Sequence, residues 1–324
     1  MAIVSNTFTT FDAKGIREEL ANTIANISPE ETPFQSNVGS ESVSNTFFEW
    51  QTDSLASTAT TAVINGDDVA TFDATSATTR LGNYTHIRRR TYIIADNLEF
   101  VDKAGRANEV AYQVAKRGKE LKRDIEAVLL DNNARVAGNT STAPETAGLP
   151  SWVHSNINEA SDETAIYDGA GEIPDGTEAR ADDGTARDFT EDMLKDVMQK
   201  TWTAGGNPSI LMVGAFNKQA VSAFTGIAAQ RYMAPSDSPT TIIGAADVYM
   251  SDFGTLTVVP NRFQRAADAF VLDPEYASVC YLRPIQQVEL AKTGDAEKGM
   301  MLAEFGLKVS NEEAHGAVYN LTTS

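Results

Sequence analysis

Side chains that could catalyse a reaction are few in this sequence and far apart. Histidine is the commonest general acid and base in enzymes, and the chain has three, His86, His154 and His315, none of them in an HExxH pair. The chain also lacks a GxSxG elbow, a GxxxxGK loop followed by Ser or Thr, and a GxGxxG pattern after a strand. The sequence therefore predicts a protein that is not an enzyme and that uses no cofactor.

Clustered carboxylates are the second possible source of chemistry, because calcium binds oxygen ligands. The stretches "NGDDVATFD" and "DGTEARADDG" hold such clusters. Neither follows the EF-hand order, which has Gly at the sixth position and Glu at the twelfth, so a solvated loop is the favoured interpretation and no metal site is predicted. A calcium-binding surface or adhesion protein is the alternative function, and the absence of a signal peptide argues against it.

Charge and composition exclude several further classes of protein. The net charge is -19 and the pI is near 4.5, which argues against a nucleic-acid binder because affinity for duplexes rests on basic side chains. Cys280 is the single cysteine, so there is no disulfide framework and no zinc-type spacing. No run approaches the roughly 20 apolar residues of a membrane span, so we expect no membrane partner and residence in a reducing cytoplasm.

Two basic clusters interrupt this acidic chain. Arg88, Arg89 and Arg90 fall in a predicted strand, where Arg88 and Arg90 share one face and Arg89 points to the other. The second cluster, residues 116–123, runs along a predicted helix. Both are more simply salt-bridging surfaces, for carboxylates of the same chain or of a neighbouring copy, than nucleic-acid sites, although weak contact with DNA is the alternative.

The elements that carry these side chains change in type along the chain. Apolar residues at helical spacing predict a short helix at 12–27, and β-branched and aromatic runs predict strands within 43–95, separated by a long two-stranded excursion poor in apolar residues. Residues 96–133 hold an unbroken helical periodicity without proline. It predicts one helix of about 36 residues, roughly 54 Å long.

The second half of the chain begins with an acidic segment. Residues 145–192 contain 13 acidic and two basic residues, more than half of the net charge, and residues 134–188 are interpreted as a solvated surface loop. An α/β pattern follows, with a helix capped by Thr190 or Asp188, a buried strand at "PSILMVG", a second helix and a hairpin at "DVYMSDFGTLTVVPN". Closing strands end the chain.

An extended segment near the start of the chain carries apolar residues that need burial. Pro29 and Pro33 keep it extended, while Phe34 and Val38 are apolar in a polar surrounding. Another part of the same chain or a partner must bury these two side chains.

The order of these parts resembles the major capsid proteins of tailed bacteriophages with the Hong Kong 97-type fold. Five stretches carry the resemblance, which covers most of the chain: "IREELANTIANISPEETPF", "FEWQTDSL", "RRRTYIIADNLEFVDKAG", "KRDIEAVLL" and "ETAGLPSWVHSN". It implies an α+β fold with an N-terminal arm, an extended β E-loop, a long spine helix, and peripheral and axial domains. The implied divisions are 1–45 for the arm, 46–95 for the E-loop, 96–188 for the peripheral domain with the spine helix (96–133) and the acidic loop, 189–280 for the axial domain, and 281–324 for strands returning to the peripheral domain.

The resemblance also implies partners and a location. Copies would form the hexamers and pentamers of a virion shell in the host bacterial cytoplasm. A scaffolding protein and a portal would take part in assembly, and a decoration or cement protein is a possible further partner. The shell would enclose double-stranded DNA through non-specific contacts. Residues expected at subunit contacts are Phe34, Val38, Trp50, Arg88, Arg89 and Arg90. The prototype crosslinks an E-loop Lys to an Asn of a neighbour. Because there is no Lys between Lys14 and Lys103, we expect a shell without that crosslink.

Overall fold

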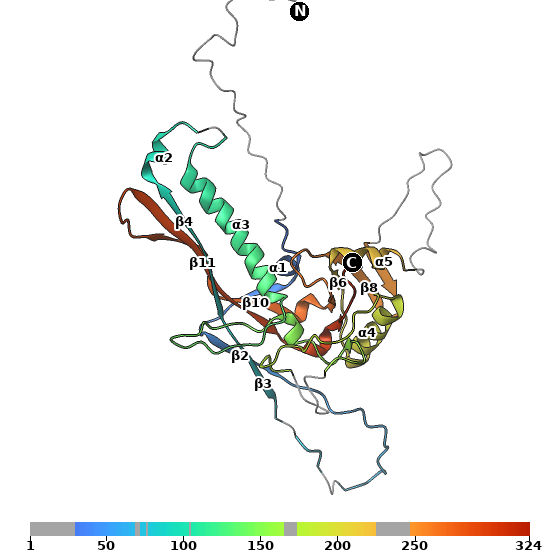
Figure 1. Ribbon diagram of the computed structural model, residues 1–324. Coiled ribbons are helices and arrows are strands. Elements are labelled where there is room, and N and C mark those ends of the chain that lie inside the picture. The colour runs from blue at the N-terminus through green and yellow to red at the C-terminus, as the bar shows by residue number, and fades with distance from the viewer. Residues whose placement is uncertain (1–29, 69–71, 76, 104, 165–173, 225–246) are drawn as a thin grey trace, which may run out of the picture.

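Two β-sheets make up the body of the molecule, and a two-stranded ribbon leaves it toward one end (Figure 1). The structure is a computed structural model that describes residues 30–324 except 69–71, 76, 104, 165–173 and 225–246. The predicted combination of helices and strands is confirmed. The helix predicted at 12–27 lies outside the described residues.

The first sheet has four strands in the order β1-β10-β11-β4. They are β1 Gly39–Ser42, β10 Ala277–Leu290, β11 Ala296–Val309 and β4 His86–Ala95. The strand β1 lies parallel to β10, and the other pairs are antiparallel. On β4, Tyr92 and Ile94 are buried while the residues between them are exposed, which is the alternation expected of a strand with one covered face.

The helix α3, Glu109–Leu129, covers that face of the sheet (Figure 1). Leu121, Ile125 and Leu129 recur at intervals of four residues and are fully buried, so they form the apolar stripe that packs on the strands. Asn108 is the N-cap, and its side chain accepts a hydrogen bond from the backbone N–H of Ala111 at 2.7 Å.

The prediction of one helix over 96–133 is wrong, because α2, Asp96–Phe100, is separated from α3 by irregular chain. Val101 has an extended backbone, and Gly105 has a φ of 80°, in the left-handed region that favours glycine. The Glu99 carboxylate accepts the backbone N–H groups of Glu109 and Val110 at 2.8 and 3.0 Å and so helps to start α3. The continuous apolar periodicity concealed this break.

The second sheet has six strands in the order β5-β12-β9-β6-β8-β7. They are β5 Ile157–Asn158, β12 Gly316–Val318, β9 Ala269–Leu272, β6 Ile210–Val213, β8 Gly254–Pro260 and β7 Val248–Ser251. The helices α4, Glu191–Ala204, and α5, Ala215–Ser222, accompany it, and a separate hydrophobic cluster forms its core. The predicted cap Thr190, the strand at 210–213 and the β7–β8 hairpin are confirmed.

The remaining elements are short. They are α1 Pro33–Asn37, the ribbon strands β2 Phe47–Thr52 and β3 Thr79–Tyr84, and three 3₁₀ turns at Leu149–Ser151, Pro274–Tyr276 and Glu312–Ala314. Two strands pair with strands outside the division predicted for them. The strand β4, assigned to the E-loop, pairs with β11 along its length, and β12, assigned to the strands returning to the peripheral domain, lies in the six-stranded sheet. Pairing partners depend on distant chain that a local pattern does not specify.

Candidate functional site

Two of the three histidines, His86 and His315, and the cysteine are packed within the fold. His315 is fully buried, its Nδ1 accepts the backbone N–H of Asp273 at 3.3 Å, and burial lowers its pKa to about 4. Burial also lowers the pKa of His86, whose ring packs against Phe305. Burial raises the pKa of the Cys280 thiol to about 11, so this thiol is a poor nucleophile at neutral pH.

Neither a metal cluster nor a membrane span occurs in the described part of the chain. Among residues 30–324, apart from the gaps given above, no three His, Cys, Asp or Glu side chains are placed to hold one metal ion. Within the same residues, no helix combines the length and apolar character needed to cross a bilayer.

The excursion, residues 53–78, is the most prominent surface feature. Its two ends continue the β2–β3 ribbon, which pairs from Phe47↔Tyr84 to Thr52↔Thr79 and is anchored by buried Trp50 and Leu81. Every described residue of the excursion itself is exposed, and it extends away from both sheets (Figure 1). Leu55, Val63, Ile64 and Phe72 are among the most exposed large apolar residues described. The prediction of an excursion that leaves the body is thus confirmed, but its two-stranded character is wrong for the described residues of 53–78, which form no strand; pairing is confined to β2 and β3 at the root.

Phe34 and Trp50 do not lie where a neighbour could reach them. Phe34 is fully buried and Trp50 nearly so, both in the core of their own chain. The Trp50 ring lies 5.3 Å from that of Trp152, centre to centre. The predicted intersubunit contacts are wrong for these two residues, because other residues of the same core already cover them. Val38 is half-buried against the same core.

A buried carboxylate joins the start of the described chain to the rest of the molecule. Glu126, on α3, accepts hydrogen bonds from the backbone N–H groups of Phe34 at 2.7 Å and Gln35 at 3.0 Å. It also accepts the side-chain amides of Gln35 at 3.0 Å and of Asn261, which follows β8, at 2.8 Å. One side chain therefore holds α1, α3 and the end of β8 together.

The arginine cluster behaves as the salt-bridging surface that the sequence predicts. Arg88 and Arg90 share the face of β4 that meets α3, and both bind Asp124, at 3.3 and 2.6 Å. The hydrogen bond to Asp124 raises the pKa of Arg90. Arg89 is exposed and lies on the opposite face of the strand. Contacts of these arginines with a neighbouring copy are not tested by the single chain.

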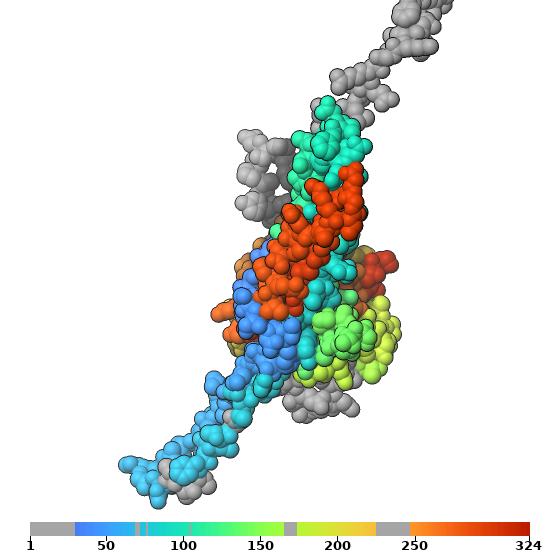
Figure 2. All heavy atoms as spheres, turned by 90° about the vertical axis from the view of Figure 1, so that its left-hand side faces the viewer, coloured from blue at the N-terminus to red at the C-terminus, as the bar shows by residue number. Residues whose placement is uncertain are grey.

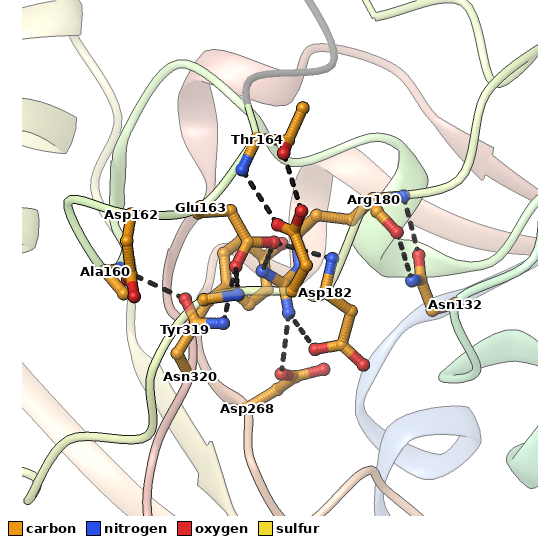
Figure 3. A network of polar contacts seen from close by, with 12 residues as sticks. Asn132, Ala160, Asp162, Glu163, Thr164, Arg180, Asp182, Asp268, Tyr319 and Asn320 are labelled. Atoms are coloured by element: carbon orange, nitrogen blue, oxygen red, sulfur yellow. Dashed lines mark hydrogen bonds and ion pairs between the residues drawn. The ribbon is translucent and has the colours of Figure 1, made fainter.

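The acidic segment is folded onto the body by a network around Arg180 (Figure 3). The Arg180 guanidinium binds Glu163 at 2.5 Å and Asp182 at 2.6 Å, and it lies over the Tyr319 ring at 4.1 Å from the ring centre. Asp268 lies 3.8 Å from the same guanidinium. Burial raises the Asp268 pKa to about 6, although Arg265 and Arg180 act in the opposite direction.

The interpretation of residues 134–188 as a solvated loop is therefore wrong for much of its described part. Leu149, Trp152 and Val153 are buried in the main core, and Arg180 is buried in the network. The sequence held two signals that were missed. One is the apolar run "LPSWV", and the other is the presence of only two arginines among many carboxylates, which indicates paired, buried charge.

Comparisons with known proteins identify the family. A family model described as the SU10 major capsid protein matches residues 3–322. The major capsid protein of Escherichia phage Phieco32 is 28% identical over 346 aligned residues, which cover 96% of each chain.

Solved structures agree in fold. The chain resembles the capsid subunit of cyanophage A-1(L) with a TM-score of 0.70 at 11% identity, covering 97% of this chain and 98% of that one. A structure of phage G major capsid and decoration proteins matches with a TM-score of 0.53 at 9% identity, covering 99% and 100%. These findings favour a shell protein over a calcium-binding surface protein, and the chain belongs to the SU10 major capsid protein family, as a structural subunit of the capsid of a tailed phage.

Proposed function

We propose that the chain builds the icosahedral head of a tailed phage as a subunit of the Hong Kong 97 type. In this proposal the four-stranded sheet with α3 is the peripheral domain, and the six-stranded sheet with α4 and α5 is the axial domain. Copies gather into pentamers and hexamers around their axial domains. The role is structural, without catalysis.

The observation that carries the proposal is the excursion. A segment that is exposed throughout its described residues and holds Leu55, Ile64 and Phe72 has no core of its own to bury them. Exposed apolar groups on this scale mark a surface that meets another protein. In a capsid subunit the partner is a neighbouring copy, so residues 53–78 act as the E-loop.

The shell is held without E-loop crosslinks. The excursion contains no lysine, so it lacks the amine that would form an amide bond with a neighbour. On a denaturing gel, mature heads should release the chain at its monomer mass of 34.9 kDa. A ladder of covalent oligomers would overturn this part of the proposal.

Other partners follow from assembly. A scaffolding protein and a portal direct assembly in the host bacterial cytoplasm, and the shell encloses double-stranded DNA through non-specific contacts. The acidic surface limits adhesion to that DNA. A decoration protein is a further partner, as in the phage G structure. Val38, Arg88, Arg89 and Arg90 keep some exposed surface and remain the proposed subunit contacts.

The test changes apolar residues of the excursion and leaves the body intact. The variant Ile64→Asp/Phe72→Asp, supplied in cells infected by a phage lacking the gene, should remain soluble and folded but should form no heads in sedimentation or negative-stain electron microscopy. The matched control Thr58→Asp adds a charge to the same exposed segment without removing an apolar group, and heads should form. Heads of normal yield from the double variant would refute the role of the excursion.

A further inference from the structure

Asn65 and Gly66, at the tip of the excursion, are the only Asn-Gly pair in the sequence. They occupy a tight turn, in which the backbone N–H of Asp67 donates to the carbonyl of Ile64 at 3.0 Å. Gly66 has a φ of 87°, the left-handed value that favours glycine at the third position of such a turn. Asn65 is exposed, and the excursion extends away from the body in two views at right angles (Figure 1 and Figure 2). The pair therefore meets water in the free subunit.

An asparagine that precedes a glycine can react with its own backbone. The nitrogen of Gly66 attacks the side-chain carbonyl carbon of Asn65, and a five-membered cyclic imide forms as ammonia leaves with the proton that this nitrogen has lost. Water then adds to one of the two imide carbonyls and opens the ring to aspartate or isoaspartate. One amide and one water become one carboxylate and one ammonium ion, so the step needs no oxidant and no enzyme.

The surroundings of the turn leave this attack unhindered. Glycine has no Cβ beside the attacking nitrogen. No heavy atom of the described residues lies within 4 Å of the position that a Cβ on Gly66 would take. Within the same residues, no hydrogen bond holds the Asn65 side chain or the Gly66 N–H. The Asn65 side chain can therefore turn its carbonyl carbon onto the nitrogen.

Asn139 is also exposed but lacks these conditions. Thr140 follows it, and the branched Cβ of threonine crowds the attacking nitrogen. The Asn139 Oδ1 accepts hydrogen bonds from the backbone N–H groups of Ser141 and Thr142, each at 2.8 Å, and from the Ser141 hydroxyl at 2.9 Å. An exposed asparagine whose side chain is held in this way serves as an internal reference in the same chain.

We infer that Asn65 is a site of spontaneous deamidation in the free subunit, and that the aspartate or isoaspartate formed there lowers the ability of the subunit to assemble. The effect on assembly rests on the proposed role of the excursion at a subunit contact. Deamidation places a third carboxylate beside Asp67 and Asp68, and an unpaired charge is costly to bury against a neighbour. Isoaspartate also lengthens the backbone by one methylene between Ile64 and Asp67, whose hydrogen bond closes the turn.

Mass spectrometry of the purified, unassembled chain tests the modification. After incubation at neutral pH and digestion, the fragment that carries Asn65 should gain the mass difference between an amide and an acid, and an isoaspartyl methyltransferase should label it. The initial rate should exceed that at Asn139 in the same sample by about tenfold or more, which corresponds to about 1.4 kcal/mol in activation free energy. The control Asn65→Gln cannot form the five-membered ring and should stay unlabelled. Equal rates at the two positions, or an unlabelled wild-type fragment, would overturn the inference.

Two substitutions test the effect on assembly in cells infected by a phage lacking the gene. Asn65→Asp carries the charge of the product from the start and should lower the yield of heads severalfold, whereas Asn65→Gln keeps a neutral amide and should give the wild-type yield. Normal heads from Asn65→Asp would refute the effect on assembly, while the mass measurement decides the modification itself. Normal heads from Ile64→Asp/Phe72→Asp would instead refute the proposed function.

Discussion

Replacing Glu126 by glutamine should detach the start of the described chain from the body of the subunit. The carboxylate is fully buried and accepts four hydrogen bonds, two of them from backbone N–H groups, at 2.7 to 3.0 Å. A glutamine side chain keeps one acceptor oxygen and turns an NH₂ group toward the remaining donors. We expect about two donors to lose their acceptor.

The magnitude follows from the cost of an unsatisfied buried donor, about 1–3 kcal/mol each. Two such donors, one of them a backbone N–H group, lower the free energy of unfolding by roughly 3 kcal/mol for Glu126→Gln. Glu126→Ala adds a cavity and should cost roughly 4 kcal/mol. The matched control is Glu120→Gln on the same helix. It removes only the ion pair with Arg117 near the surface, which is worth about 1 kcal/mol or less.

Urea unfolding measures these differences on a chain that also carries Ile64→Asp/Phe72→Asp, so that assembly does not contribute. Limited proteolysis then reports whether residues 30–38 have been released. Faster cleavage within 30–38 should accompany the loss of stability in Glu126→Gln and should be absent in Glu120→Gln. A Glu126→Gln chain within about 0.5 kcal/mol of its parent, with unchanged cleavage, would refute the reasoning.

Three further substitutions probe the buried groups. Asp268 has a folded pKa of about 6 against an ordinary 3.8. Its contribution to the free energy of unfolding is therefore complete below about pH 4 and is lost as pH rises through 6. The free energy of unfolding of Asp268→Asn, relative to that of the wild type, should rise by on the order of 3 kcal/mol between pH 4 and 7. His315 has a pKa of about 4 against an ordinary 6.5. Its contribution to the free energy of unfolding is therefore lost as pH falls from 6.5 to 4. His315→Gln should remove this pH-dependent loss, which is again on the order of 3 kcal/mol. Trp152→Ala should lower the free energy of unfolding by about 3–5 kcal/mol.

Urea unfolding as a function of pH separates the first two predictions, because their signs are opposite. The argument for the buried Asp268 carboxylate would be contradicted if the difference in unfolding free energy between Asp268→Asn and the wild type stayed constant from pH 4 to 7. The argument for the buried His315 imidazole would be contradicted if His315→Gln lost as much stability as the wild type between pH 6.5 and 4. A loss below about 1 kcal/mol in Trp152→Ala would show that residues 149–153 are not part of the core.

Elements whose caps and residue alternation lie within a short stretch of chain could be predicted from the sequence. The helix α4 was predicted with a cap at Thr190 or Asp188, and the stretch that forms β7 and β8 was predicted as a hairpin, because capping residues and alternation are local properties. The shared face of Arg88 and Arg90 followed from the period of a strand. Their partner Asp124 did not, since it lies on a helix that reaches them only in the folded chain.

Features that depend on tertiary contact were missed for identifiable reasons. The break before α3 was not predicted because Leu98 and Val101 continue the helical period, although both side chains are exposed. Phe34 was expected to bind a neighbour because two prolines suggested an extended chain. Pro33 instead occupies the first turn of α1, a position that favours proline, and this could have indicated a short helix that buries Phe34.

The candidate contact surface divides in the same way. The excursion could be predicted, because its Ala, Thr, Ser and Asp content cannot cover a core. Its anchor on the body could not, since Trp50 packs against Trp152, which is far away in the sequence.

Electron cryomicroscopy of assembled heads tests the central claim most directly. The account predicts that residues 53–78 of each copy lie against a neighbouring copy, around every pentamer and hexamer. A map in which the excursion folds back onto its own subunit, or projects into solvent without touching another copy, would contradict it.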